Sequence, residues 1–583
     1  MIPYSLIIAD SFIMATFLHY NKIKQHITLI DFQCDYRIGV GQGLLLIKIT
    51  LGTQTQWEED FMAEQGKFKK ELNTTDLTFV ALGAIFGSGW LFGASFVAQY
   101  AGPAGIISWV IGGITVFFLG LVYCELGAAL PKAGGIIRFP VFSHGELVGY
   151  LLASLTVIAF SSLIAIEVVA ARQYAAAWLP WLTADPSGSP TLAGWIAQLL
   201  LTILFFVINY NGVKSFAIAN NIISLFKFVV PALVMVVLMF YFQPENLTAH
   251  GFAPFGSHGV QMAVTAGGVI FAYLGLTPVV SVASEVKNPQ RTIPIALLLS
   301  IVLSTIIYII LQLVFLGSIP PDMLSEGWGS IAAKFSLPYH DIALLLGLGW
   351  LGMLVVADAV ISPAGTGNIY MVATPRVIYA WSRSGTFFSR FSAVDRKSGI
   401  PRPALWLTLG LSIFWTMPFP SWKELINVVS GALCLSYALA PIACGALRIN
   451  APDLPRPFRV RGLKIISPLT FVIASLIVYW SGWSVICWLF PIELLLFVAY
   501  ILASKKVPTQ HVSLQQQIKS TLWLVAYYIL TLIISYLGSF GGKGILTSPW
   551  DVVAMGIVAL VCYYWAMKTC LPKANITEAP DAD

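Results

Sequence analysis

The feature that most constrains this chain is a succession of apolar runs, each about 20 residues long and bounded by glycine, proline or charge. A run of this length spans the hydrocarbon core of a bilayer as a helix. The composition agrees, since 57% of the 583 residues are hydrophobic and only 10% are charged. Soluble domains lie far from these proportions. The sequence therefore predicts an all-α integral membrane protein that is surrounded by a lipid bilayer.

About fourteen transmembrane helices are predicted from these runs. If the N-terminus is cytoplasmic, the outward loops contain only three basic residues, Lys334, Lys423 and Lys543. The positive-inside rule therefore predicts this orientation, with both termini in the cytoplasm. The predicted spans are 76–99, 105–130, 146–180, 192–210, 219–242, 261–284, 294–317, 341–365, 403–418, 423–447, 463–480, 484–503, 520–539 and 549–569.

Residues 1–61 contain only short apolar patches, which charged residues interrupt before any reaches spanning length. Met62 precedes a polar, basic stretch that is typical of the cytoplasmic start of a membrane protein. We therefore expect residues 1–61 to be an N-terminal extension outside the core, arising from an incorrect translation start, with Met62 as the true first residue.

The first span is interrupted in its middle by Gly87, Ser88 and Gly89. Backbone that leaves a helix at membrane depth is tolerated only where protein buries it or where it lines a cavity, and broken helices of this kind form transport sites. The half-helix that follows presents free N–H groups and the positive end of its dipole, which favour an anion such as a carboxylate. The alternative is a glycine face that serves close helix packing.

The sixth span contains a second interruption, at Gly275 and Pro278. Breaks at matching places in two halves predict a binding site between repeats of opposite topology. The predicted organisation is a first inverted repeat at 62–242 with helices 1–5, a second at 261–447 with helices 6–10, four peripheral helices at 463–569 and a polar C-terminal tail at 570–583.

Three motifs resemble those of permeases in the amino acid–polyamine–organocation (APC) superfamily, and the resemblance extends from Leu72 to Lys506. They are Gly87-Ser88-Gly89, Leu130-Pro131-Lys132-Ala133-Gly134-Gly135 and Glu285-Val286-Lys287-Asn288-Pro289. Ala165-Ile166-Glu167-Val168 and Ile361-Ser362-Pro363-Ala364-Gly365 are similar to the bacterial branch typified by aspartate–proton symporters. The resemblance implies a five-plus-five inverted-repeat (LeuT-type) core, alternating access, and a place in the bacterial cytoplasmic (inner) membrane.

The substrate site implied by the resemblance agrees with the physical interpretation of the breaks. N–H groups after the first break would face the α-carboxylate of an amino acid, and carbonyls of the sixth span would accept from its α-ammonium. Three aromatic residues among these are candidate gates, Trp90, Phe271 and Tyr273, although each could equally serve packing. The predicted substrate-binding residues are Gly87, Ser88, Gly89, Trp90, Phe271, Ala272, Tyr273 and Gly275.

From Met62 onward, Lys227 and Arg172 are the basic residues predicted to lie inside the membrane, where an ionisable side chain is costly and suggests function. The resemblance implies that Lys227 couples a proton to transport, whereas the alternative is a permanently charged lysine that reaches a headgroup or holds backbone carbonyls. Glu167 and Asp358 are candidate proton relays. Arg172 is a candidate specificity residue for an acidic substrate side chain, or else contacts an outer headgroup.

Glu125 and Glu285 lie at the cytoplasmic ends of predicted helices, beside Lys132 and Lys287. We expect each to form a structural ion pair there. All seven histidines fall outside the predicted spans. This argues against a membrane-embedded metal site or a histidine-based catalytic centre, and it predicts that no cofactor is needed.

These observations predict a transporter rather than an enzyme, which takes a small amino-acid substrate, acidic as in aspartate or glutamate, in symport with protons. The chain has no GxxxxGK[ST] motif, so an ion gradient or exchange rather than ATP is the expected driving force, and the resemblance implies that the gradient is one of protons. No nucleic-acid partner is implied. An amino-acid exchanger or a polyamine carrier is the alternative within transport. An intramembrane enzyme is disfavoured, because the spans offer no His or Cys arrangement as nucleophile and base.

Overall fold

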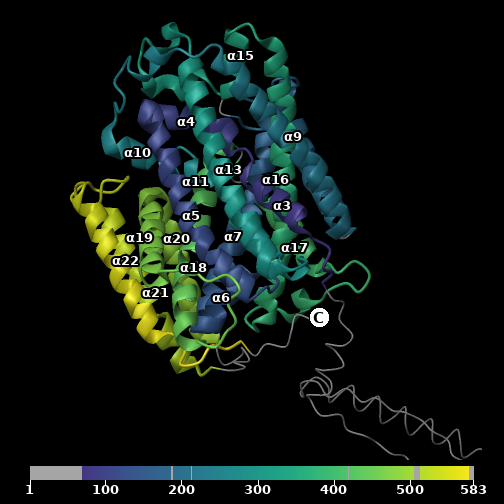
Figure 1. Cartoon of the computed structure of the whole chain (residues 1–583), viewed down its shortest axis with the longest axis vertical. Coiled ribbons are helices and arrows are strands. Elements are labelled where there is room, and N and C mark those ends of the chain that lie inside the picture. Colours follow the sequence, from purple (N-terminus) through teal and green to yellow (C-terminus); the bar gives the residue numbers. More distant parts are fainter. Residues whose placement is uncertain are drawn as a thin grey trace, which may run out of the picture. The chain divides into compact units, whose positions relative to one another are not determined.

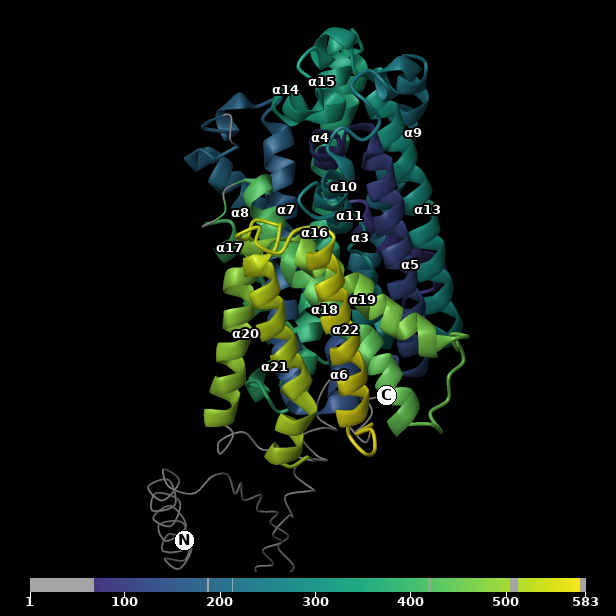
Figure 2. The ribbon, with the colours of Figure 1, turned by 90° about the vertical axis from the view of Figure 1, so that its left-hand side faces the viewer.

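The computed structural model describes residues 68–576, except 186–187, 212, 418, 420 and 504–511. The expectation for residues 1–61 lies outside this part of the chain. The described residues are nearly all helical, and their only β-type pairings are the isolated bridges Leu72 to Val286 and Thr183 to Pro190. Figures 1 and 2 show the helices running mostly along one common direction, as expected for spans that cross a bilayer together.

The helices occupy most of the predicted ranges. Those of the predicted first repeat are α3 (Thr74–Ile85), α4 (Gly89–Ala101), α5 (Gly105–Ala129), α6 (Gly135–His144), α7 (Glu146–Ala175), α8 (Leu192–Tyr210) and α9 (Val213–Met239). Those of the predicted second repeat are α10 (Gly256–Thr265), α11 (Val269–Ala272), α12 (Leu276–Ser281), α13 (Pro289–Ser318), α14 (Ile331–Lys334), α15 (Pro338–Leu345), α16 (Gly349–Arg383), α17 (Arg402–Trp415) and α18 (Trp422–Asn450).

The predicted peripheral helices are α19 (Leu463–Trp480), α20 (Trp483–Ala503), α21 (Leu514–Leu537) and α22 (Trp550–Thr569). They lie together on one flank of the core in both views, and α18 and α22 both pack against α19. Short 3-10 turns connect several helices, at Gly102–Ala104, Pro180–Leu182, Pro244–Leu247, Ala283–Glu285, Pro321–Leu324, Trp328–Ser330 and Ser389–Ser392.

Eleven helical segments of the described chain are long and apolar enough to cross a membrane. One of them, Thr74–Ala129, contains almost all of the first two predicted spans. The α17 helix is short, with 14 residues. The count of fourteen therefore stays a prediction.

The predicted breaks near Gly87 and Gly275 are confirmed, whereas Pro278, predicted as part of the second break, lies in the first turn of α12 and does not interrupt it. In the first span, α3 ends at Ile85 and α4 begins at Gly89. The sixth span is divided into three pieces, since α10, α11 and α12 are separated at Gly268 as well as near Gly275. Gly268 has φ of 87°, a left-handed conformation that glycine adopts without steric cost. The break at Gly268 was not predicted.

Other elements also differ from the predictions. The predicted span 341–365 is divided at its start, since α15 ends at Leu345 and α16 begins at Gly349. The α16 helix continues to Arg383, well past the predicted end at residue 365, because Pro363 and Pro375 are accommodated within it. Helices tolerate proline at membrane depth where neighbouring helices satisfy the freed backbone groups. Residues expected in a loop after the second span instead form α6, which follows Gly134. A Cβ at Gly134 would lie 2.5 Å from the Arg376 carbonyl oxygen, so α6 and α16 approach closely there.

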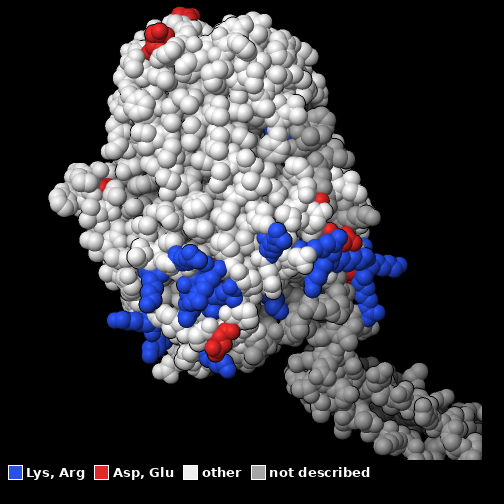
Figure 3. Space-filling view, viewed as in Figure 1, with Lys and Arg blue, Asp and Glu red and all other residues white. Residues whose placement is uncertain are grey.

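The polar C-terminal tail begins against α6, because the backbone N–H groups of Leu571 and Asn575 donate to Ser143 and Phe142. The charged side chains are unevenly distributed around this region. On the face that Figure 3 shows, Lys and Arg gather mainly over the end of the molecule where α6 lies. This distribution is the one expected if that end faces the cytoplasm.

Candidate functional site

The end of α3 leaves backbone carbonyls without helical partners, and Lys227 of α9 reaches them. Its Nζ donates to the carbonyl oxygens of Gly83 at 2.6 Å and Phe86 at 2.8 Å, and to Oγ1 of Thr366 at 2.8 Å. The Lys227 side chain is fully buried. The three oxygens take all three donors of an ammonium group. The predicted intramembrane lysine therefore lies at the first break, joined to both α3 and α16.

The start of α4 is occupied by a carboxylate of the protein itself. Oε2 of Glu167, from α7, accepts from the Ser88 N–H at 2.8 Å. This is the position at which the sequence predicts a substrate carboxylate, because a helix N-terminus presents free N–H groups and positive partial charge. Glu167 and Lys227 therefore lie on the two sides of one break.

The two broken spans pack directly on each other. A Cβ at Gly89 would lie 2.7 Å from both Cα and Cβ of Ala272, and a Cβ at Gly275 would lie 2.7 Å from the Ile85 nitrogen. A Cβ at Gly87 would collide with the Glu167 carboxylate. In this conformation Gly89 and Gly275 therefore allow close approach of backbone to backbone, and a substrate needs the two breaks to move apart.

Tyrosine hydroxyls hold the other carbonyls that the breaks set free. The single O–H of Tyr308 in α13 is shared between the carbonyl oxygens of Ile85 at 2.7 Å and Ala272 at 3.1 Å, so one hydroxyl joins the two breaks. Tyr370 of α16 donates to the carbonyl of Leu274. The carbonyls predicted to receive a substrate ammonium are thus engaged here. Sequence reasoning missed both tyrosines, because nothing local separates them from the other 20 of the chain's 22 tyrosines.

An indole covers the break on the side of α10 and α18. Trp422 Nε1 donates to Oγ of Ser88 at 2.7 Å, and the ring stacks on Phe92 with centroids 4.8 Å apart. Among the candidate gates, Phe271 meets Trp422 edge-on at 5.8 Å. Trp90 instead packs against Tyr339 of α15 at 5.1 Å. Sequence reasoning missed Trp422, which carries no local signal beyond its position at a helix start.

Tyr273, the third candidate gate, lies in the core away from Trp422. Its hydroxyl donates to the Trp109 carbonyl at 3.1 Å, and its ring meets the ring of Tyr308 at 5.3 Å. Tyr273 therefore fastens the sixth span to α5 and α13 in this conformation.

One face of α16 presents polar groups to the first break at a spacing of four residues, which brings them onto one side of a helix. Thr366 Oγ1 donates to Gly83 at 2.7 Å, and Ser362 Oγ donates to Phe86 at 3.2 Å. Asp358 follows one turn away and is 2% exposed. Its carboxylate oxygens have no hydrogen-bond partner among the described residues. The structure therefore brings Glu167, Lys227 and Asp358 into one region.

Arg172 is not brought to this region. Its Nε donates to Gln198 at 3.0 Å, Nη1 to Thr183 at 3.0 Å and Nη2 to the Gly188 carbonyl at 2.5 Å. These acceptors belong to α8 and to the connection between α7 and α8. The guanidinium therefore holds the connection between α7 and α8. It does not lie at the breaks, where the predicted contact with an acidic substrate side chain would be made.

Glu285 forms an ion pair, as predicted, but its partner is not the neighbouring Lys287. Its Oε1 accepts from Arg376 Nε at 2.6 Å and its Oε2 from Nη2 at 3.0 Å, in place of the expected Lys287. The error follows from ending α16 too early, which put Arg376 in a loop.

Glu125 was likewise assigned to Lys132, whereas Arg448 Nε donates to its Oε1 at 2.8 Å and Arg456 lies within 3.5 Å. These arginines come from α18 and from the connection that follows it.

Another buried carboxylate, Glu493 of α20, was overlooked, although an acidic residue inside a predicted span is a visible signal. It is fully buried, and its carboxylate oxygens have no hydrogen-bond partner among the described residues. In the part of the chain that the structure describes, no three His, Cys, Asp or Glu side chains are grouped so that they could hold a metal ion.

Comparison with known proteins shows which family this chain belongs to. The amino acid permease family model matches residues 72–534. The aspartate-proton symporter of Bacillus subtilis (strain 168) is 56% identical over 516 residues, which are 88% of this chain and 99% of that protein. The glutamate/serine transporter AimA of the same organism is 37% identical over 510 residues, 86% and 94% of the two chains.

A third relative, the branched-chain amino acid permease BcaP of Bacillus subtilis (strain 168), is 28% identical over 454 residues, 75% of this chain and 94% of that protein. These relatives are transporters and not enzymes. Together with the eleven membrane-length helical segments, they make this a multi-pass membrane protein with a LeuT-type fold. The chain belongs to the amino acid permease family of the APC superfamily.

Proposed function

We propose that this protein imports an acidic amino acid, such as aspartate or glutamate, together with protons by alternating access. The 56% identical relative is named an aspartate-proton symporter, and the 37% identical relative a glutamate/serine transporter. The contact that carries the proposal is the donation from Lys227 to the freed carbonyls of Gly83 and Phe86. The proposed driving force is the proton gradient across the bacterial cytoplasmic membrane, with both termini inside and with no cofactor or ATP.

Lys227 is the proposed proton-coupling group. As an ammonium it donates to three oxygens, which ties α9 to the break and to α16. A neutral amine has one donor fewer, so loss of the proton must release one of these contacts. The release would loosen α9 from the break, and this links the proton to the change between inward-facing and outward-facing states.

The proposed substrate contacts are backbone groups. The N–H groups from Ser88 to Trp90 bind the α-carboxylate, and the carbonyls from Phe271 to Leu274 receive the α-ammonium. Because Glu167 now accepts from the Ser88 N–H, the arriving carboxylate takes its place. The released Glu167 then relays a proton or contacts the substrate ammonium, and Asp358 is a second candidate relay.

The test is uptake of labelled aspartate into proteoliposomes that contain the purified full-length protein, with the interior alkaline. The wild-type protein should accumulate aspartate, and accumulation should stop when a protonophore collapses the gradient. In Lys227→Met the side chain keeps most of its length but cannot carry a proton. This variant should lose gradient-driven accumulation and keep measurable aspartate binding. Lys397→Met, the same change at an exposed loop residue, should behave as wild type.

Size-exclusion chromatography in detergent distinguishes lost coupling from lost folding in the Lys227 variant. If Lys227→Met is monodisperse and still accumulates aspartate with the gradient, the assignment to Lys227 is refuted and Glu167 or Asp358 takes its place. Counterflow of aspartate that does not respond to pH would make the protein an exchanger. Uptake of a polyamine in place of aspartate would refute the acidic substrate.

A further inference from the structure

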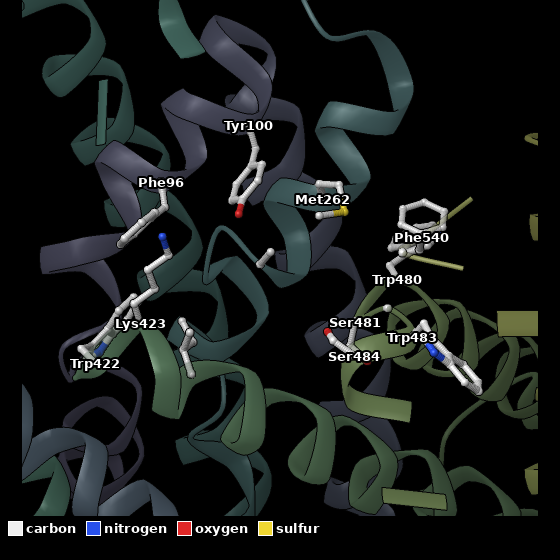
Figure 4. A pocket seen from close by; sticks show the side chains of 14 residues that line it. Phe96, Tyr100, Met262, Trp422, Lys423, Trp480, Ser481, Trp483, Ser484 and Phe540 are labelled. Carbon is white, nitrogen blue, oxygen red and sulfur yellow. The ribbon is translucent and has the colours of Figure 1, made fainter. Parts of the chain in front are cut away.

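A pocket of about 220 Å³ lies between the core and the peripheral helices. Phe96 and Tyr100 of α4 and Trp422 and Lys423 of α18 form one side, and the tight turn between α19 and α20 forms the other, with Ser481 and Ser484 (Figure 4). This volume is below the roughly 300 Å³ at which sites for drug-sized ligands begin, so it suits a small solute. The predicted orientation places the pocket on the outer side.

The floor of this pocket is the indole that covers the first break. Trp422 lines the pocket and at the same time donates through Nε1 to Ser88 at 2.7 Å. Its ring is held by Phe92 at 4.8 Å and by Phe96 at 5.9 Å, both in stacked geometry. A solute in the pocket is therefore separated from the proposed substrate site by one side chain, and the pocket lies on the route between that site and the outside.

The pocket contains one cation, Lys423, which follows Trp422 directly in the chain. Lys423 has no ion pair among the described residues, and Glu424 lies about 100° further round the helix, so the two side chains do not face each other. The two other lysines of the predicted outer loops are engaged, since Lys334 pairs with Glu326 at 2.9 Å and Lys543 lies over the Tyr536 ring at 5.8 Å.

Polar groups accompany the lysine in the pocket. Figure 4 shows the Tyr100 hydroxyl and the Lys423 amine on the wall made by the core helices, and Ser481 and Ser484 on the wall opposite. The Lys423 ammonium can donate hydrogen bonds to a carboxylate, and the hydroxyl oxygens can accept from an ammonium. Lys423 is exposed at the edge of the pocket, and its positive charge raises the local concentration of small anions, an effect that salt screens.

We propose that this pocket is an entry site for acidic amino acids, in which Lys423 binds a substrate carboxylate before Trp422 moves aside and opens the first break. The inference rests on the proposed import of an acidic amino acid and adds a second, outer binding step. It also gives the peripheral helices a part in transport, because the turn between α19 and α20 closes the pocket opposite Lys423.

The test compares Lys423→Gln with Lys543→Gln, which removes the same charge from another residue of the predicted outer loops outside the pocket. Initial rates of gradient-driven aspartate uptake are measured against aspartate concentration in proteoliposomes. Lys423→Gln should raise KM for aspartate about two- to fivefold, as for an exposed ion pair, with kcat unchanged. Lys423→Arg should restore KM. Added salt should raise KM in wild type and Lys543→Gln, and much less in Lys423→Gln.

Equal KM values and equal salt dependence in Lys423→Gln, Lys543→Gln and wild type would overturn the entry site while leaving proton-driven import intact. If the wild-type protein transports no acidic amino acid, the proposed function fails. Whether the pocket binds an acidic amino acid is then tested separately, by a binding measurement. Titration with aspartate should change the fluorescence of the pocket tryptophans in wild type and Lys543→Gln, but not in Lys423→Gln. An unchanged signal in all three proteins, or the same change in all three, would overturn the pocket.

Discussion

The buried pair of Glu285 and Arg376 offers the most quantitative test of the structure. Two parallel hydrogen bonds of 2.6 and 3.0 Å join the side chains, which are 0% and 1% exposed. The same region ties the chain before α3 to the end of the sixth span, because the Leu72 N–H donates to Glu285 at 3.0 Å and the Lys287 N–H to Leu72 at 2.7 Å. The predicted orientation makes this the closed cytoplasmic end.

Removing one partner should be much more harmful than removing both. Arg376→Met leaves the Glu285 carboxylate buried without its counter-ion, and Glu285→Gln leaves the guanidinium in the same position. Each single change should lower the free energy of unfolding by about 3–5 kcal/mol. The double variant has no buried charge left at this position, and replacing a whole buried pair is often close to neutral. It should therefore be more stable than either single variant.

Thermal unfolding of the four purified proteins in detergent measures this double-mutant cycle. Arg390→Met, the same change at an exposed residue, is the control and should keep the wild-type Tm. A double variant whose loss of stability equals the sum of the two single losses would refute the reasoning, because the side chains would then not act as a pair. A wild-type Tm in Arg376→Met would refute it as well.

Two further predictions follow from the packing of the breaks and from the position of Arg172. Gly89→Ala should lower Tm, because the added methyl group overpacks against Ala272 at a cost of about 1–3 kcal/mol. The control Gly410→Ala should keep the wild-type Tm, because a Cβ there meets nothing within 4 Å. Equal Tm values for the two variants would contradict the close contact at Gly89. Arg172→Ala should raise KM for aspartate and KM for a neutral substrate by the same factor, because the Arg172 guanidinium donates to Gln198. A change in KM for aspartate alone would contradict this prediction.

The sequence was sufficient to predict most of the helical spans and the interruptions near Gly87 and Gly275. Apolar length, glycine and proline act within a few residues of where they occur, so the spans and the breaks near Gly87 and Gly275 follow from local physics. The break at Gly268 and the continuation of α16 to Arg383 were missed, because glycine also occurs within membrane helices and proline does not always end them. Because an ionisable side chain inside the membrane is costly, Lys227 could be identified from the sequence alone as a candidate functional residue.

The partners of the buried polar groups were decided only by the tertiary structure. The residues that Lys227, Glu285 and Tyr308 contact lie on other helices, far away in the chain, and the sequence does not state which faces of two helices meet. A freed carbonyl or a buried charge takes the donor that packing brings within about 3 Å, not the nearest one in sequence. For the same reason, Trp422 donates to Ser88 at the first break, whereas Arg172 donates to Gln198 of α8.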